Sequence, residues 1–142
     1  YLAENRFYVG TSTAITTPSL FCKGNGTSST AQPLVENVED MQITYGVAPS
    51  SATTTLTVAG YLTASGMATT ADAAFNALSD ADKWAKVATV RVCLIVRSEN
   101  PVAPSSESAQ YYNCSGTLTS APDLRLRRAY TTTIVLRNRL GT

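Results

Sequence analysis

The sequence predicts an α+β fold that is mostly antiparallel β-sheet with one short helical insert. Segments in which apolar or β-branched residues alternate with polar ones recur along the chain, and Gly-, Pro- and Ser-rich stretches separate them. Helix-capping signals are concentrated between about residues 70 and 86. Since strands then far outweigh helix, an antiparallel sheet is the simplest architecture. With 142 residues and 44% hydrophobic content, one globular domain over residues 1–142 is expected.

The N-terminal half is expected to contain short strands and one turn. Aromatic and apolar residues favour strands at 6–10 and 19–22. Between residues 34 and 41 the apolar positions follow helical spacing, which indicates a turn. From Met41 onward the period becomes two, which indicates that the turn leads into a strand. Residues 56–63 alternate weakly and are expected to form a strand near a sheet edge.

Two capping signals define the helical insert. Thr70 or Asp72 can cap a first short helix, and Ser79 with Asp82 forms a capping box for a second helical turn. Trp84 follows as the only tryptophan of the chain. We expect it to fill the gap between the insert and the sheet, and stacking on a ligand is the alternative.

The clearest strand runs from Val87 to Arg97 and is expected to be central in the sheet. One of its faces is apolar throughout and is expected to lie in the core: Ala88, Val90, Val92, Leu94 and Val96. The other face is mixed and is expected to be partly covered: Thr89, Arg91, Cys93, Ile95 and Arg97. Residues 100–108 form a loop, and the last strand is expected from Ala129 to about Arg139 because threonine and β-branched residues dominate there.

Three cysteines are present, and no two of them are close enough for a C-x-x-C redox or zinc motif. Cys22 and Cys114 each lie at the edge of a turn, whereas Cys93 lies in an apolar run where a free thiol behaves as a small hydrophobe. We therefore expect a Cys22–Cys114 disulfide with Cys93 unpaired. Three reduced cysteines are the alternative.

Catalysis is not expected, and no cofactor is implied. The chain has no histidine, which excludes a histidine-based triad, metal site or general base. No serine lies in a recognisable Ser-Lys motif. Glu36, Glu39 and Asp40 form a carboxylate cluster, but no D-x-D-x-D pattern accompanies them. Glu39 and Asp40 are therefore expected to be strand-entry and capping residues, and a metal role is the alternative. A net charge of +1 gives the chain as a whole no attraction to nucleic acid or acidic membranes.

Three ordered blocks of sequence carry a family resemblance. They are Pro33 to Gln42 with Tyr45-Gly46-Val47 behind it, Trp84 followed by Val87 to Ser98, and Arg125 to Arg139. In order and spacing over about residues 19–140, the chain resembles the C-terminal part of PilW-family minor pilins of type IV pili. The resemblance implies a pilin-like head that lacks its N-terminal helix, so we expect the chain to be the C-terminal part of a longer prepilin.

The resemblance also implies a function, a location and partners. Such a subunit docks with other minor pilins and the major pilin, primes pilus assembly and sits at the pilus tip, where an adhesin is a further candidate partner. It would lie in the inner membrane and periplasm before assembly and in the extracellular pilus afterwards, with membrane contact only through the N-terminal helix absent here. A tip-located binding module for DNA, a surface or an adhesin is one alternative function. A J-type pseudopilin of type II secretion is another.

Five arginines near the C-terminus are the candidate interaction residues. They supply five of the eleven basic residues of the chain: Arg125, Arg127, Arg128, Arg137 and Arg139. A basic stripe is how DNA binding would begin. However, strand alternation splits the charge between two faces. We therefore favour pairing with Glu36, Glu39 or Asp40, or contact with a neighbouring pilin, over DNA binding.

Overall fold

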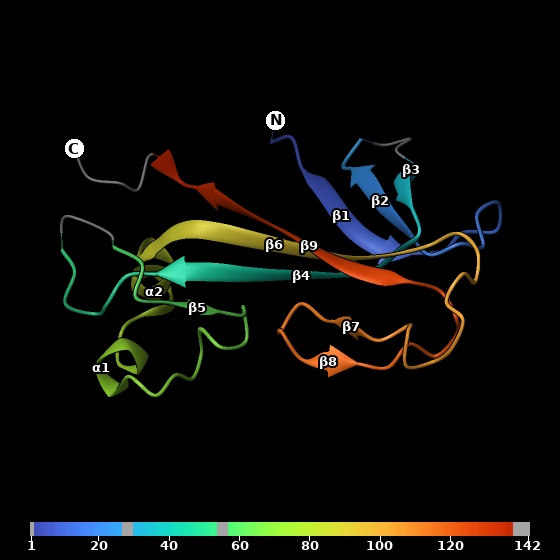
Figure 1. Ribbon diagram of the computed structural model, residues 1–142. Helices are drawn as coiled ribbons and strands as arrows, with labels where there is room; N and C mark the ends of the chain where they lie inside the picture. Colours follow the sequence, from blue (N-terminus) through green and yellow to red (C-terminus); the bar gives the residue numbers. More distant parts are fainter. Residues whose placement is uncertain (1, 27–29, 54–56, 138–142) are drawn as a thin grey trace. The chain divides into compact units, whose positions relative to one another are not determined.

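The computed structural model describes residues 2–26, 30–53 and 57–137 (Figure 1). Its strands form a three-stranded sheet in the order β1-β2-β3, a four-stranded sheet in the order β5-β4-β6-β9, and a β7-β8 hairpin. The two helices found among the described residues are short, so the predicted α+β fold with a small helical insert is confirmed. The elements are β1 (Asn5–Gly10), β2 (Ser19–Gly24), β3 (Gln32–Glu36), β4 (Val38–Val47), β5 (Gly60–Leu62), α1 (Ala73–Asn76), α2 (Asp80–Ala85), β6 (Val87–Arg97), β7 (Tyr111–Tyr112), β8 (Leu118–Thr119) and β9 (Arg127–Val135).

The chain packs as two compact units. Residues up to Gln42 together with Cys93–Tyr130 form the first unit. Ile43–Val92 together with the residues from Thr131 onward form the second. The expectation of one domain over residues 1–142 stays a prediction.

The three-stranded sheet belongs to the first unit. Tyr8 of β1 lies opposite Phe21 of β2, and their rings stack with centroids 5.6 Å apart. Phe21 is buried, whereas all five residues of the edge strand β3 are exposed. The strands predicted at residues 6–10 and 19–22 are confirmed.

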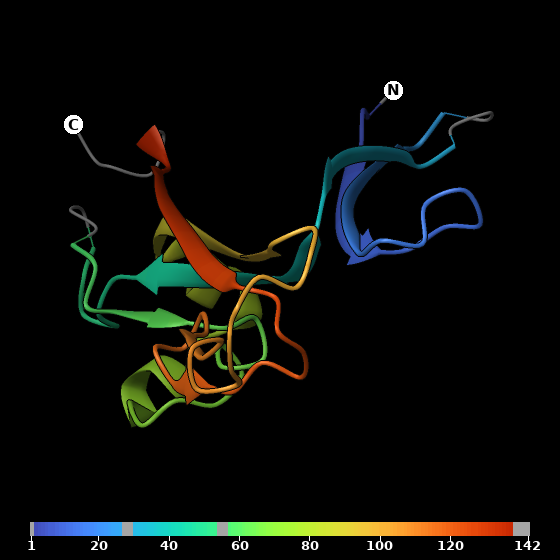
Figure 2. The ribbon, with the colours of Figure 1, turned by 45° about the vertical axis from the view of Figure 1, so that its right-hand side comes forward.

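The predicted turn at residues 34–41 is wrong. The chain passes directly from β3 into β4, with Asn37 as the only residue between them (Figure 2). Asn37 has φ of 63°, a left-handed conformation that asparagine tolerates better than most residues. Its carbonyl accepts a hydrogen bond from the Arg97 backbone N–H at 2.9 Å. A single residue therefore makes the connection for which the sequence predicted a longer turn.

Strand β6 matches its predicted bounds and has a strand on either side. In the first unit its C-terminal end bonds to the residues just before both neighbours, since Arg97 N–H donates to the Asn37 carbonyl and Ser98 N–H donates to the Leu126 carbonyl at 2.8 Å. In the second unit the Ala88 carbonyl accepts from Leu136 N–H at 2.9 Å. These bonds make β6 antiparallel to β9.

The predicted core face of β6 is wrong in the first unit. Cys93 and Ile95 are buried there, at 5% and 3% exposure, whereas Leu94 and Val96 are only half-buried. The sequence assigned the core to the continuous apolar face. The structure instead covers the mixed face, because a disulfide ties Cys93 to Cys114 and the Glu39 carboxylate neutralises Arg97 at the end of that face.

The second unit contains the hydrophobic core beside the helices. Buried Val47, Met67, Phe75 and Val87 form the centre of this cluster. Asp72 caps α1 by accepting hydrogen bonds from two backbone N–H groups, and Ser79 caps α2 by accepting from Asp82 N–H at 3.2 Å. Both predicted capping signals are therefore confirmed, and α1 carries the buried core residue Phe75.

Trp84 contacts the sheet without being enclosed by it. Its ring meets Tyr45 of β4 edge to face, with centroids 4.8 Å apart. The packing contact with the sheet agrees with the prediction, but Trp84 remains 41% exposed. The expectation that it fills a gap is therefore wrong. The short edge strand β5 covers only residues 60–62 of the predicted 56–63, and Leu56 lies outside the described residues.

Candidate functional site

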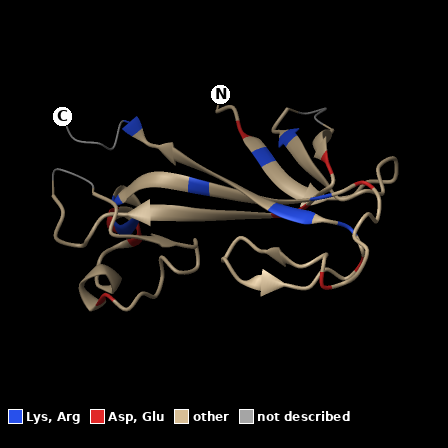
Figure 3. Cartoon of the chain, in the orientation of Figure 1, with Lys and Arg blue, Asp and Glu red and all other residues tan. Residues whose placement is uncertain are grey.

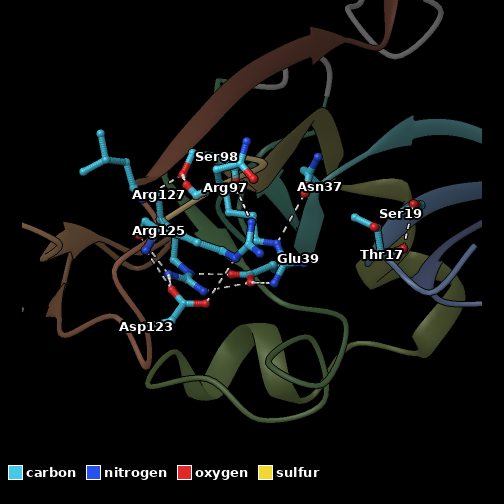
Figure 4. A network of polar contacts seen from close by, with 11 residues as sticks. Thr17, Ser19, Asn37, Glu39, Arg97, Ser98, Asp123, Arg125 and Arg127 are labelled. Carbon is cyan, nitrogen blue, oxygen red and sulfur yellow. Dashed lines mark hydrogen bonds and ion pairs between the residues drawn. The ribbon is translucent and has the colours of Figure 1, made fainter. Parts of the chain in front are cut away.

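The most highly connected polar group in the first unit is the Arg127 guanidinium, at the start of β9 (Figure 4). Its side chain is 1% exposed. Nε donates to Glu39 Oε2 at 2.6 Å and Nη2 donates to Glu39 Oε1 at 2.9 Å. Nη1 donates to Asp123 Oδ1 at 2.7 Å and to the Arg125 carbonyl at 3.0 Å. A buried guanidinium is costly unless its donors are satisfied, and here two carboxylates and one carbonyl satisfy them.

Glu39 joins three strands through its carboxylate. It lies on β4, receives Arg127 from β9, and accepts a third hydrogen bond from Arg97 Nη1 of β6 at 3.0 Å. Arg97 Nε also points to the Asn37 side chain, with 3.4 Å between Nε and Oδ1. The prediction that the C-terminal arginines pair with Glu36, Glu39 or Asp40 is confirmed for Glu39. Glu36 is exposed on β3, and Asp40 accepts from Gln42 instead.

The network shifts two pKa values in directions that favour its charged form. The hydrogen bond from Arg127 holds the pKa of Asp123 at about 2, below its usual value of 3.8. Burial opposes the charge on Arg127, but hydrogen bonds from its guanidinium to Asp123 and Glu39 outweigh that cost and raise the pKa of Arg127. The arrangement can therefore hold strands together over a wide pH range, and it keeps the guanidinium protonated.

Asp123 was missed as a partner in the sequence. It lies four residues before Arg127 and also pairs with Arg125, with 3.6 Å between Arg125 Nε and Asp123 Oδ2. Arg125 Nη1 donates in addition to the Ser98 carbonyl at 3.1 Å. The available signal was the acidic residue just ahead of a basic run, in a segment where Pro122 indicates a turn.

The remaining candidate arginines take no part in this network. Figure 3 shows the start of β9 as a basic segment. Within it Arg128 is exposed, and its guanidinium carbon lies 5.8 Å from the centre of the Tyr130 ring. Arg137 is exposed in the second unit. Arg139 lies outside the described residues. Of the five predicted residues, Arg125 and Arg127 are thus paired with carboxylates, and Arg128 and Arg137 are exposed.

The predicted disulfide is wrong in its pairing. Cys93 of β6 is bonded to Cys114, with Cα atoms 5.8 Å apart, and Cys22 is a free thiol on β2. The turn after β7 presents Cys114, because Asn113 Oδ1 accepts from the Ser115 and Thr117 N–H groups. Cys22 belongs to the three-stranded sheet, where it lies opposite Phe7. The apolar run around Cys93 suggested a buried free thiol, but Cys93 is bonded to Cys114, which lies between β7 and β8.

Two surface hollows flank Arg128 in the first unit. One, of about 370 Å³, is lined by Val96, Leu126 and Tyr130 together with polar parts of residues 97, 98, 127 and 128. The other, of about 350 Å³, is lined by Tyr111, Tyr112 and residues 127–129. Both hollows are open to solvent, and Arg128 borders each of them.

No group of three His, Cys, Asp or Glu side chains among the described residues is placed to hold a metal ion. The carboxylates of the network already bind guanidinium groups. Across the same described ranges, none of the helices has the length and apolar character needed to cross a membrane.

These features define a disulfide-containing, mostly antiparallel β protein of the kind found in oxidising compartments. Within that class, the family model described as Type IV Pilus-assembly protein W matches residues 6–138. The chain therefore belongs to the PilW family, which confirms the resemblance in its sequence and gives the protein a role in type IV pilus assembly. A search of curated proteins and a search of solved structures each found no match.

Proposed function

We propose that this protein is a minor pilin that docks with other minor pilins to prime assembly of a type IV pilus and sits at the pilus tip. Family membership over residues 6–138 is the observation that carries the proposal. The major pilin is the next subunit in contact with this complex. In the proposed sequence of events, the protein is held at the inner membrane through an N-terminal apolar helix and then becomes part of the extracellular pilus.

The surface of the first unit supports a role in docking. Large apolar side chains there face solvent at about half exposure or more: Phe7 (53%), Leu34 (52%), Tyr112 (65%), Leu118 (53%) and Tyr130 (57%). Exposed apolar area favours association with other proteins, and the exposed edge strand β3 offers unpaired backbone groups as well.

The proposal includes no turnover of a substrate. The chain has no histidine, and the most buried charged group of the first unit, Arg127, is bound on both sides by carboxylates. A guanidinium with a raised pKa is a poor proton donor, so the network suits a structural purpose better than acid–base catalysis.

Deletion of the gene tests the proposal directly. We expect fewer surface pili with unchanged amounts of major pilin in the cell, because a priming subunit acts on assembly and not on synthesis. Expression of the gene in trans should restore piliation. Purified protein should also form a complex with other minor pilins in size-exclusion chromatography.

Other outcomes point to the alternatives. Normal piliation and no minor-pilin complex, together with loss of DNA, surface or adhesin binding, would favour a tip-located binding module. Normal piliation with loss of protein secretion would favour a type II secretion pseudopilin.

A further inference from the structure

We propose that Arg128, with Leu126 and Tyr130 beside it, is the contact point for an acidic and partly apolar segment of a partner pilin. This inference rests on the proposed docking function and names the chemistry of the docked segment. It also separates Arg128 from the other arginines of the C-terminal run.

The arginines around the network outnumber its carboxylates. Four guanidinium groups gather at this end of β6 and β9, from Arg97, Arg125, Arg127 and Arg128. Among the described residues, only two carboxylates, those of Glu39 and Asp123, form ion pairs with these groups. Three of the arginines pair with these two acids, so the six side chains taken together carry an excess of positive charge. A partner that brings a carboxylate would reduce this excess of positive charge.

Arg128 is the cation that remains available. It forms no ion pair with any carboxylate of the described residues, and it is exposed. The neighbouring Arg127 is 1% exposed and already bound by two acids. An incoming carboxylate therefore meets Arg128 first, and a guanidinium can bind it through two parallel hydrogen bonds.

The surroundings of Arg128 favour a protein segment with apolar side chains. Leu126 and Tyr130 are 47% and 57% exposed, and with Val96 they line the hollow on one side of Arg128. Tyr111 and Tyr112 line the hollow on the other side. Arginine and tyrosine are enriched among the residues that dominate binding energy at interfaces, particularly where apolar neighbours exclude water.

The same charges argue against nucleic acid as the occupant. A phosphate backbone is bound by several cations at once, and here three of the four arginines are committed to carboxylates. The net charge of the whole chain is only +1. A single exposed guanidinium beside hollows that are partly lined by apolar side chains fits one carboxylate with an adjacent apolar side chain better than it fits a line of phosphates.

Charge reversal tests the inference with an internal control. Arg128→Glu should weaken binding to the other minor pilins of the same pilus by about tenfold or more. Arg137→Glu makes the same charge change at an exposed residue of the second unit and should have little effect. Both variants should keep the thermal midpoint of the wild type, because neither arginine supports the buried network. Equal affinities for the two variants would overturn the inference while the docking function stands.

A peptide titration tests the chemistry without any pilin. The probes are the amidated, acetylated peptide Glu-Leu-Glu-Leu-Glu, its counterpart Gln-Leu-Gln-Leu-Gln, and a short DNA duplex. We expect the glutamate peptide to shift the NMR amide signals of residues 126–130 saturably, and the glutamine peptide to do so at least tenfold more weakly. A response of the same size to both peptides, or a stronger response to DNA, would overturn the inference. If no minor pilin bound the wild type but the glutamate peptide did, the docking function would fail and the acidic-segment site would stand.

Discussion

Glu39 and Arg127 are 88 residues apart in the sequence and bind each other through two parallel hydrogen bonds of 2.6 and 2.9 Å. The pair joins β4 to β9, which are separated in the sheet by β6. Arg97 of β6 binds the same carboxylate. One acidic side chain thus connects all three strands at this end of the sheet, in addition to the backbone hydrogen bonds between them.

Replacement of Glu39 by Gln should destabilise the protein by about 2–4 kcal/mol, since it leaves two arginines short of a carboxylate in a largely buried setting. Urea denaturation of the two proteins measures this difference. Glu36→Gln is the matched control, because Glu36 is exposed on β3, and it should change stability by less than about 0.5 kcal/mol. Similar costs for the two variants would show that the ion network adds no stability.

Asp123 should make stability depend on pH in the acid range. Its pKa in the folded protein is about 2 and its usual value is 3.8, so its charged form is favoured by folding. The stabilisation is complete above the usual value and is lost as the pH falls from about 4 towards 2. The difference in urea midpoint between wild type and Asp123→Asn should therefore shrink over that interval. A difference that stayed constant down to pH 2 would contradict the depressed pKa.

Peptide mapping by mass spectrometry, after digestion without reduction, should find the disulfide between Cys93 and Cys114. Only Cys22 should react with an alkylating reagent in the unfolded, unreduced protein. Cys114→Ala should cost about 3 kcal/mol in the chain-entropy model, given the sequence separation of 21 residues. Cys22→Ala removes a thiol but no bond, and it should cost clearly less. A peptide that joins Cys22 to either of the other cysteines would refute this pairing.

Gly46 and Gly60 offer a comparison of crowded and open glycines in the second unit. A Cβ added at Gly46 would collide with Thr89 Oγ1 and would lie 3.1 Å from Tyr61 Cε1, whereas one at Gly60 would meet no atom within 4 Å. Gly46→Ala should therefore destabilise the protein by about 1–3 kcal/mol. Gly60→Ala should be neutral or stabilising by up to about 1 kcal/mol, because alanine restricts the unfolded chain. Thermal unfolding of both variants decides the matter, and equal midpoints would disprove the close approach at Gly46.

The features that sequence predicted well are local ones. The bounds of β6 follow from its unbroken β-branched run, and the caps Asp72 and Ser79 bind backbone groups within three residues of themselves. The choice between the faces of β6 was wrong because it depends on what packs there, and the disulfide to Cys114 lies on the side that carries Cys93. Likewise Glu39 could be named as a partner, but its selection over Glu36 depends on the strand pairing, which places Glu39 on β4 beside β6 and leaves Glu36 exposed on β3.

At the candidate site, too, the sequence could not predict which arginines are buried. Sequence identified a basic run and a carboxylate cluster, and opposite charge alone suggested that they pair. It gave no means of distinguishing Arg127, which is buried, from Arg128, which is exposed, beyond the alternation of faces in a strand. That alternation was enough to separate them once the position of β9 was known. The role of Asp123 required the path of the chain before β9 as well.

The Cys93–Cys114 bond closes the chain between β6 and the β7-β8 hairpin into a ring. Residues at the outer part of this ring are accessible, as the 57% exposure of Val102 shows. A protease that cuts there adds two chain ends but releases no fragment, since both sides of the cut stay on one covalent molecule. β6 and β9 then remain parts of the same molecule even after their peptide connection is broken.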